Sequence, residues 1–181
     1  MLITGERSSL LVVDVQEKLC PVMDDPRAVL HNGARLMRGA ARLGIPVTVT
    51  EQYPEGIGPT MFDLRELTGP ENVLQKRTFS SAAEETIVAR LRDFGRPQVV
   101  VCGIEAHVCV LQTALGLKEI GYDVYVVRDA CSSRRVADRD AAFARMAAAG
   151  VGVVTTEMAL FEWVGDSRHE AFREISKTLI K

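Results

Sequence analysis

Cys109 stands where a strand pattern changes into a helix pattern. The stretch from Gln98 to Leu117 reads QVVVCGIEAHVCVLQTALGL. Its short β-branched run at 99–101 precedes a glycine, which is typical of a strand buried on both faces. From about His107, apolar residues recur at helical spacing. We therefore expect Cys109 in or near the first turn of a helix.

The start of a helix suits a nucleophilic thiol. The positive end of the helix dipole favours the thiolate over the thiol. Free backbone N–H groups in the same turn can stabilise a developing oxyanion. Cys109 is therefore a candidate nucleophile, and the alternative is a small buried hydrophobic residue, as most free cysteines are.

Two charged residues follow other strand patterns. Asp14 comes directly after the apolar run 10–13, where a buried carboxylate is costly unless it is paired or used. Lys76 ends the short strand pattern 72–75. Each also has an ordinary interpretation, the aspartate as a loop cap and the lysine as a solvated charge. Beside a thiol, however, an aspartate can act as its base, and a lysine can hold both groups in ionised form. A pairing of Cys109 with His107 stays open.

Strand and helix patterns alternate along the whole chain, with no internal repeat and no linker. This alternation predicts an α/β fold, a Rossmann-like three-layer sandwich with a six-stranded, mostly parallel sheet and helices on both faces. The expected order is 3-2-1-4-5-6, so strands 1 and 4 flank the reversal where ligands bind. Asp14, Lys76 and Cys109 would then meet at one edge. The expected strands are 10–13, 45–50, 72–75, 99–102, 122–127 and 151–154; the expected helices include 28–43, 81–94 (opened by a Ser81-x-x-Glu84 capping box), 107–120, 138–149, 157–164 and 171–179.

Composition narrows the class of protein. The 181 residues carry 22 basic and 24 acidic side chains, for a net charge of −2. Without a basic stripe, nucleic acid is not an expected partner, and no apolar run reaches the length of a membrane span. The first nine residues lack a signal-peptide pattern. The four cysteines show no CxxC spacing, so we expect reduced thiols in the cytoplasm and no zinc ribbon.

Several motifs together resemble one family, the isochorismatase-like, or cysteine hydrolase, superfamily. Its pattern is an aspartate ending the first strand, a lysine followed shortly by Phe-Ser (79–80 here), and a cysteine in G-x-x-x-x-x-C-V-x-x-T-A (103–114). The isochorismatase domain-containing subgroup is most similar, through TEQYP at 50–54, the VCVLQTAL stretch at 108–115 and DACSSR at 129–134. The resemblance covers nearly the whole chain and implies a single hydrolase domain over 1–181.

The resemblance implies a catalytic triad of Asp14, Lys76 and Cys109. It also implies a non-proline cis peptide between Ile104 and Glu105, which would turn the Glu105 N–H toward the Cys109 N–H to form an oxyanion hole. The candidate substrate-binding residues are Gln16, Tyr53, Phe79 and His107, and each of these also has a packing or loop interpretation.

The chain departs from two branches of that superfamily. Nicotinamidases hold a metal through a D-x-H motif after strand 2, where this chain reads Glu-Gln-Tyr at 51–53. We therefore expect no catalytic metal and no cofactor. Isochorismatases that act on a vinyl ether lack the cysteine, so Cys109 indicates attack on a carbonyl carbon instead.

The expected function is hydrolysis of a small amide C–N bond through a thioester. Because the family usually self-associates, we expect a homo-oligomer. The main alternative is a small-molecule-binding or scaffold protein with an unused triad. Redox sensing by Cys109 is a further alternative, although Cys102, a strand residue, is poorly placed as its resolving thiol.

Overall fold

Six strands form one parallel sheet in the order β3-β2-β1-β4-β5-β6. The computed structural model describes residues 1–180. The predicted fold class and strand order are confirmed. The strands are β1 (Ser8–Val13), β2 (Val47–Gln52), β3 (Val73–Lys76), β4 (Gln98–Ile104), β5 (Asp123–Ser132) and β6 (Gly152–Val154).

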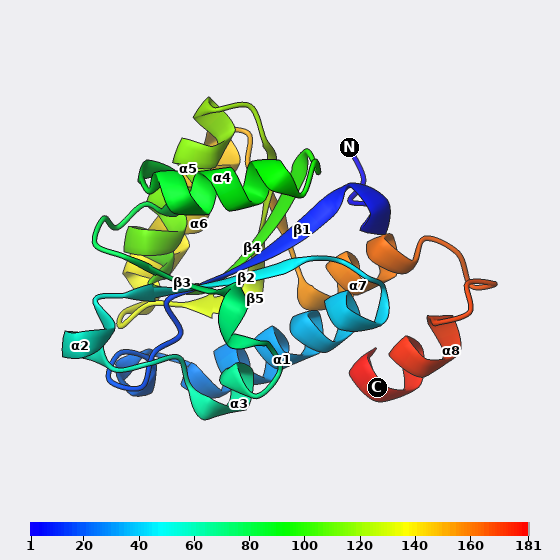
Figure 1. Cartoon of the computed structure of the whole chain (residues 1–181), viewed down its shortest axis with the longest axis horizontal. Coiled ribbons are helices and arrows are strands. Elements are labelled where there is room, and N and C mark those ends of the chain that lie inside the picture. The colour runs from blue at the N-terminus through cyan, green and yellow to red at the C-terminus, as the bar shows by residue number, and fades with distance from the viewer. Residues whose placement is uncertain (181) are drawn as a thin grey trace.

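Helices cover both faces of the sheet (Figure 1). On one face lie α1, α3 and α7, and on the other lie α4, α5 and α6. None of the helices within residues 1–180 has both the length and the hydrophobicity of a membrane span. The α-helices are α1 (Pro26–Arg42), α2 (Pro54–Ile57), α3 (Phe62–Arg65), α4 (Glu85–Asp93), α5 (Leu111–Glu119), α6 (Val136–Ala148), α7 (Thr156–Val164) and α8 (Phe172–Ile175). The π-helical turns are Ala106–Val110 and Ser176–Ile180, and the 3-10 turns are Gly5–Arg7, Cys20–Val22, Pro70–Asn72 and Ser81–Ala83.

The central strands β1 and β4 are buried along their whole length. Helices on both faces remove them from water, which is why their sequences are nearly continuous apolar runs. From β1 the chain builds outward first to β2 and β3, and then crosses to β4, β5 and β6. The loops after β1 and β4 therefore diverge, and a crevice is expected between them at the carboxyl ends of these strands.

Gly103 allows β4 to lie close to the end of β1. Its φ is +124°, and a Cβ atom there would lie 2.0 Å from the Val13 carbonyl oxygen. Val13 and Gly103 are partners in the parallel pairing. The next residue, Asp14, has φ +53°, which turns the chain sharply out of β1. Asp14 and the segment after Gly103 therefore leave the sheet side by side.

The predicted capping box of Ser81 and Glu84 is wrong. Ser80 caps the short turn instead, and the Glu84 carboxylate accepts hydrogen bonds from the backbone N–H groups of Arg77 and Thr78, both at 3.0 Å. These hydrogen bonds lower the pKa of Glu84. Glu84 directly precedes α4, but its side chain stabilises the loop that follows β3 and forms no capping box with Ser81.

Candidate active site

Asp14 and Lys76 form a fully buried ion pair at the carboxyl edge of the sheet. Lys76 Nζ lies 2.7 Å from Asp14 Oδ2, and both side chains are 0% exposed. The other carboxylate oxygen of Asp14 accepts a hydrogen bond of 2.7 Å from Thr50 Oγ1. Thr50 lies in β2 and Lys76 ends β3, and Asp14 directly follows β1, so the sheet itself fixes the pair.

The Lys76 ammonium group is held by further oxygen atoms. It donates to Gln52 Oε1 at 2.8 Å and to the carbonyl oxygens of Thr78 and Phe79 at 3.1 and 3.0 Å. An ammonium group has three N–H donors, and these three acceptors use all of them, so Asp14 Oδ2 contacts Lys76 as an ion pair without a hydrogen bond. Lys76 is therefore a fixed positive charge beside Asp14.

Cys109 is 5% exposed and lies in the π-helical turn Ala106–Val110 that leads into α5. Burial, followed by the negative charge of Asp14, raises the pKa of the Cys109 thiol to about 12, and Lys76 opposes this rise. The expected preference for thiolate at a helix start is therefore wrong for the resting protein, because desolvation and the carboxylate outweigh the helix dipole. A raised pKa favours the protonated thiol at neutral pH, and Asp14 is the carboxylate whose charge acts most strongly on it.

The peptide bond between Ile104 and Glu105 is cis, at the position expected from the resemblance. The Glu105 side chain is largely buried and forms an ion pair with Arg134, in which Arg134 Nε lies 2.8 Å from Glu105 Oε1. The turn that carries Cys109 therefore begins at Glu105, whose side chain is held by Arg134 in the loop after β5.

The four predicted substrate-binding residues differ in their surroundings. Gln16 is completely buried. Its amide nitrogen donates hydrogen bonds to the carbonyl oxygens of Gln52 and Gly58, and its amide oxygen accepts one from the Gln52 N–H. It therefore holds the loop after β2 closed. His107 is only half-buried, and its Nδ1 lies 2.9 Å from the hydroxyl oxygen of Ser133.

Tyr53 and Phe79 lie on the loops after β2 and β3. They are 43% and 54% exposed, respectively, although large apolar side chains are usually buried. The Arg77 guanidinium stacks over the Tyr53 ring, with its central carbon 4.1 Å from the ring centroid. These two rings extend from the loops that follow Gln52 and Lys76 and are the exposed candidates for contact with a ligand.

Three residues at the site were not identified from the sequence. Gln52 contacts Lys76, Ser133 contacts His107, and Arg134 contacts Glu105. All three lie in the TEQYP and DACSSR motifs, which were therefore the available signal. Spacing alone assigns no role to an amide, a hydroxyl or a guanidinium group at those positions.

The place of the nicotinamidase metal motif holds a buried carboxylate. Glu51 is 6% exposed. One of its oxygens accepts hydrogen bonds from the Thr60 N–H and hydroxyl at 2.7 and 2.8 Å. In the part of the chain that the structure describes, no three His, Cys, Asp or Glu side chains are grouped as metal ligands would be.

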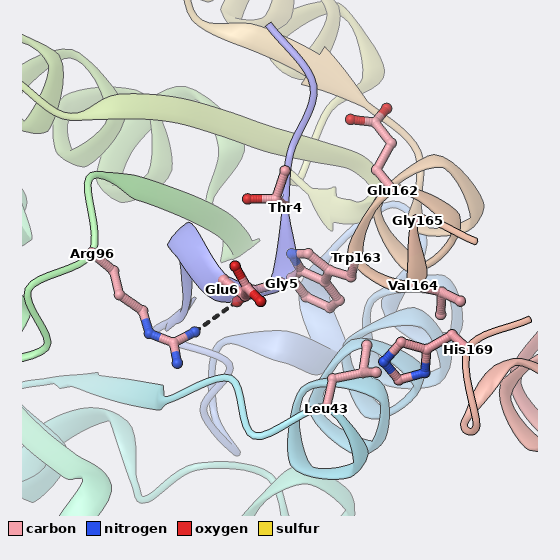
Figure 2. A pocket seen from close by; sticks show the side chains of 10 residues that line it. All are labelled: Thr4, Gly5, Glu6, Leu43, Arg96, Glu162, Trp163, Val164, Gly165 and His169. Atoms are coloured by element: carbon pink, nitrogen blue, oxygen red, sulfur yellow. Dashed lines mark hydrogen bonds between the residues drawn. The ribbon is translucent and has the colours of Figure 1, made fainter.

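The cavity shown in Figure 2 is separate from this site. It has a volume of about 320 Å³ and is lined by Trp163, His169 and Arg96, among others. Arg96 precedes β4, so the cavity lies near the amino ends of the strands, away from Asp14 and Cys109. The Arg96 guanidinium donates to the carbonyl oxygens of Gly5 and Ser8 at 2.7 and 2.8 Å. The Arg96 side chain therefore stabilises the chain at the start of β1.

Comparison with known proteins gives a consistent result. The isochorismatase domain model matches residues 8–158. Isochorismatase domain-containing protein 2 from Danio rerio is 41% identical over 174 residues, covering 95% of this chain and 86% of that protein. Isochorismatase domain-containing protein 1 from Salmo salar is 42% identical over 166 residues, covering 92% of this chain. The chain spans 58% of the length of that longer relative.

Solved structures share the whole fold. One is described as the MAR1 ribonuclease from Caenorhabditis elegans, with a TM-score of 0.93 and 39% identity, covering 99% of this chain and 92% of that one. Another is YcaC from Pseudomonas aeruginosa with hexane-2,5-diol and covalent acrylamide, with a TM-score of 0.92 and 27% identity over 99% and 92% of the two chains.

Proposed function

The chain belongs to the isochorismatase family, and from this premise we propose that it is a cysteine hydrolase that cleaves a small amide through a thioester. The observation that carries the proposal is the buried Asp14–Lys76 ion pair beside the Cys109 thiol. A buried ion pair contributes little to stability compared with apolar residues of the same size. A chemical role is the simplest reason for placing one against a cysteine.

In the proposed first step, Asp14 takes the thiol proton as Cys109 Sγ attacks the amide carbon. The carbonyl electrons move to oxygen, and the backbone N–H groups of Glu105 and Cys109 stabilise the oxyanion. Lys76 keeps its charge throughout and lowers the cost of the negative charge that moves between Asp14 and sulfur. A raised thiol pKa suits this step, because the proton stays on sulfur until a substrate is present.

The tetrahedral intermediate then collapses. The C–N bond breaks, and protonated Asp14 gives its proton to the leaving amine, so a neutral amine departs and a thioester remains on Cys109. In the second half, Asp14 takes a proton from a water molecule whose oxygen attacks the thioester. The C–S bond breaks, the proton returns to sulfur, and the free acid is released.

A relative supports testing Cys109 with small electrophiles. YcaC from Pseudomonas aeruginosa was solved with covalent acrylamide, and acrylamide reacts with nucleophilic side chains. All four cysteines of this chain are free and buried.

Free thiols are the rule in reducing compartments, so we also propose that the protein is cytoplasmic.

The ribonuclease description of the Caenorhabditis elegans neighbour provides a second candidate function. The net charge of −2 does not favour a phosphate backbone as ligand, and the buried triad suits a compact substrate better than a polymer. Incubation with labelled RNA tests this candidate. Cleavage that is lost in Cys109→Ala would replace the amide by a phosphodiester at the same site.

The proposal is tested with an activated ester, p-nitrophenyl acetate, followed by intact and peptide mass spectrometry. We expect a burst of nitrophenol and one acetyl group on Cys109, both lost in Cys109→Ala and strongly reduced in Lys76→Met. Cys20→Ala is the matched control, because Cys20 is another buried thiol whose pKa burial raises, to about 11. Acetylation elsewhere, or none, would favour the binding or scaffold alternative.

A further inference from the structure

Glu105 carries a side chain whose charge is neutralised from another loop. Its carboxylate oxygens Oε1 and Oε2 lie 2.8 and 3.3 Å from Arg134 Nε and Nη2. The Arg134 backbone N–H adds a longer bond of 3.4 Å to Oε1. Such two-pronged guanidinium–carboxylate contacts fix direction as well as distance. The residue whose backbone N–H is proposed to bind the oxyanion is therefore held in orientation by Arg134.

A second contact holds the same turn from the neighbouring residue. The hydroxyl oxygen of Ser133 lies 2.9 Å from His107 Nδ1, and Ser133 is completely buried. His107 and Glu105 lie two and four residues before Cys109. Adjacent residues of one loop therefore contact the nucleophile turn at two points.

The loop that makes these contacts is itself anchored. Ser132 ends β5 and pairs with Ile104, the last residue of β4. The Ser133 carbonyl accepts a hydrogen bond of 2.9 Å from the Asp24 N–H, and Ser132 Oγ accepts one of 3.3 Å from the Asp25 N–H. The segment Ser132–Arg134 is thus held by β4 on one side and by the Asp24–Asp25 backbone on the other. It therefore gives the turn that carries Cys109 a fixed support.

We propose that Arg134 is a positioning residue for the oxyanion hole, acting through Glu105, with Ser133 assisting through His107. The inference rests on the proposed function, because it assigns a task within the acyl-transfer step. Arg134 itself need not touch the substrate. It fixes where the Glu105 N–H points when negative charge develops on the carbonyl oxygen.

Electrostatics adds a second effect of the same contact. The charged groups that face the Cys109 thiol are Asp14 and Glu105, which raise its pKa, and Lys76, which lowers it. Arg134 offsets the charge of Glu105 from the far side. Removing Arg134 would both loosen the Glu105 backbone and leave its carboxylate uncompensated, and the thiol would become harder to ionise.

Two reactions of the same thiol separate these effects. Iodoacetamide alkylates sulfur by direct displacement at a saturated carbon, and no oxyanion forms. p-Nitrophenyl acetate acylates sulfur through a tetrahedral oxyanion. In Arg134→Ala we expect the ester reaction to fall roughly tenfold or more beyond any fall in alkylation, since loss of an oxyanion donor costs about a hundredfold or more. Arg134→Lys should recover part of the ester reaction, because one charged contact to Glu105 remains.

The controls decide between this inference and its rivals. Arg92→Ala removes an exposed ion pair with Glu85, of 3.1 Å, and should leave both rates unchanged. Ser133→Ala should lower the ester reaction in the same direction as Arg134→Ala. If the ratio of the ester rate to the alkylation rate is the same in wild type and in Arg134→Ala, the inference is overturned. That result is also the one expected if Arg134 serves only to bind an anionic substrate.

Failure of the proposed function has a different signature. If wild-type Cys109 is not acylated at all, the hydrolase proposal falls and the positioning role falls with it. If wild-type Cys109 is acylated and Arg134→Ala behaves like wild type, only the positioning role is lost. Thermal unfolding of each variant, measured beside the rates, shows whether a slow variant is still folded.

Discussion

At the scale of single residues, the central feature is the raised pKa of the Cys109 thiol. Burial, followed by the charge of Asp14, raises the pKa to about 12, although the positive charge of Lys76 opposes the rise. A reactive cysteine is usually recognised by a depressed pKa. Here activation would come instead from a base beside the thiol. This limits side reactions with oxidants, because oxidants attack the thiolate and not the thiol.

Titration of the thiol tests this description. Because the folded-state pKa is raised from its ordinary value of 9.0, Cys109 should remain a thiol at and below pH 9. In Asp14→Asn the carboxylate that raises the pKa is gone, so the midpoint should fall. The ¹³Cβ chemical shift of labelled cysteine measures both, with Cys109→Ala to assign the signal. A wild-type midpoint below 9 would show that Lys76 outweighs burial and Asp14 together.

Part of the site could be predicted from single residues. Lys76 ends one strand, and Asp14 and Cys109 come after two others. Because the carboxyl ends of parallel strands share one edge, the convergence of the three residues needs only the strand order. The contact of Gln52 with Lys76 could not be predicted in this way, since it depends on which side-chain rotamer fills the space. The direction of the Cys109 pKa was wrong for a similar reason: helix position is visible in a sequence, but the extent of burial is not.

At the scale of elements, the approach of β4 to β1 decides whether the site exists. Gly103 makes that approach possible, because the Val13 carbonyl occupies the space that a Cβ would need. Strand and helix positions were predictable from periodicity. The Ser81 capping box was not, because the Glu84 carboxylate binds the loop after β3 instead, and a spacing rule carries no knowledge of that loop.

Replacement of Gly103 should damage stability and the site together. In Gly103→Ala the added methyl group would lie 2.0 Å from the Val13 carbonyl oxygen, so β4 must move away from β1. We expect a loss of about 3 kcal/mol or more in unfolding free energy, with Cys109 displaced from Asp14. Urea denaturation and acylation of Cys109 measure the two effects.

Gly44 provides the matched control for Gly103. It also has a positive φ, +64°, but nothing lies within 4 Å of an added Cβ. Gly44→Ala should therefore cost only about 1–2 kcal/mol, from backbone strain, and leave acylation unchanged. Similar losses in the two variants would mean that conformation alone, and not the close approach of the strands, makes Gly103 necessary.

At the scale of the whole molecule, the two ends of the sheet have different tasks. At the amino ends, Arg96 binds backbone carbonyls beside the cavity of Figure 2. At the carboxyl ends, a buried ion pair and a thiol meet under loops that carry exposed aromatic rings. The arrangement follows from parallel strands, whose helix-bearing crossovers place all following loops on one side. Arg96 therefore stabilises the chain at the amino ends, whereas chemistry is proposed for the carboxyl ends.

Self-association is the last prediction, and it concerns α7. Met158 and Phe161 are 46% and 40% exposed and lie three residues apart on one helix face, where the Phe161 ring packs near that of Phe172. Apolar side chains grouped on one face favour contact with a second copy, so sedimentation should give a mass above that of one chain. Phe161→Glu should lower that mass. Ile120→Glu should not, because Ile120, which is 47% exposed, directly follows α5 and does not belong to α7. A concentration-independent monomer in the wild type would contradict the prediction without affecting the triad.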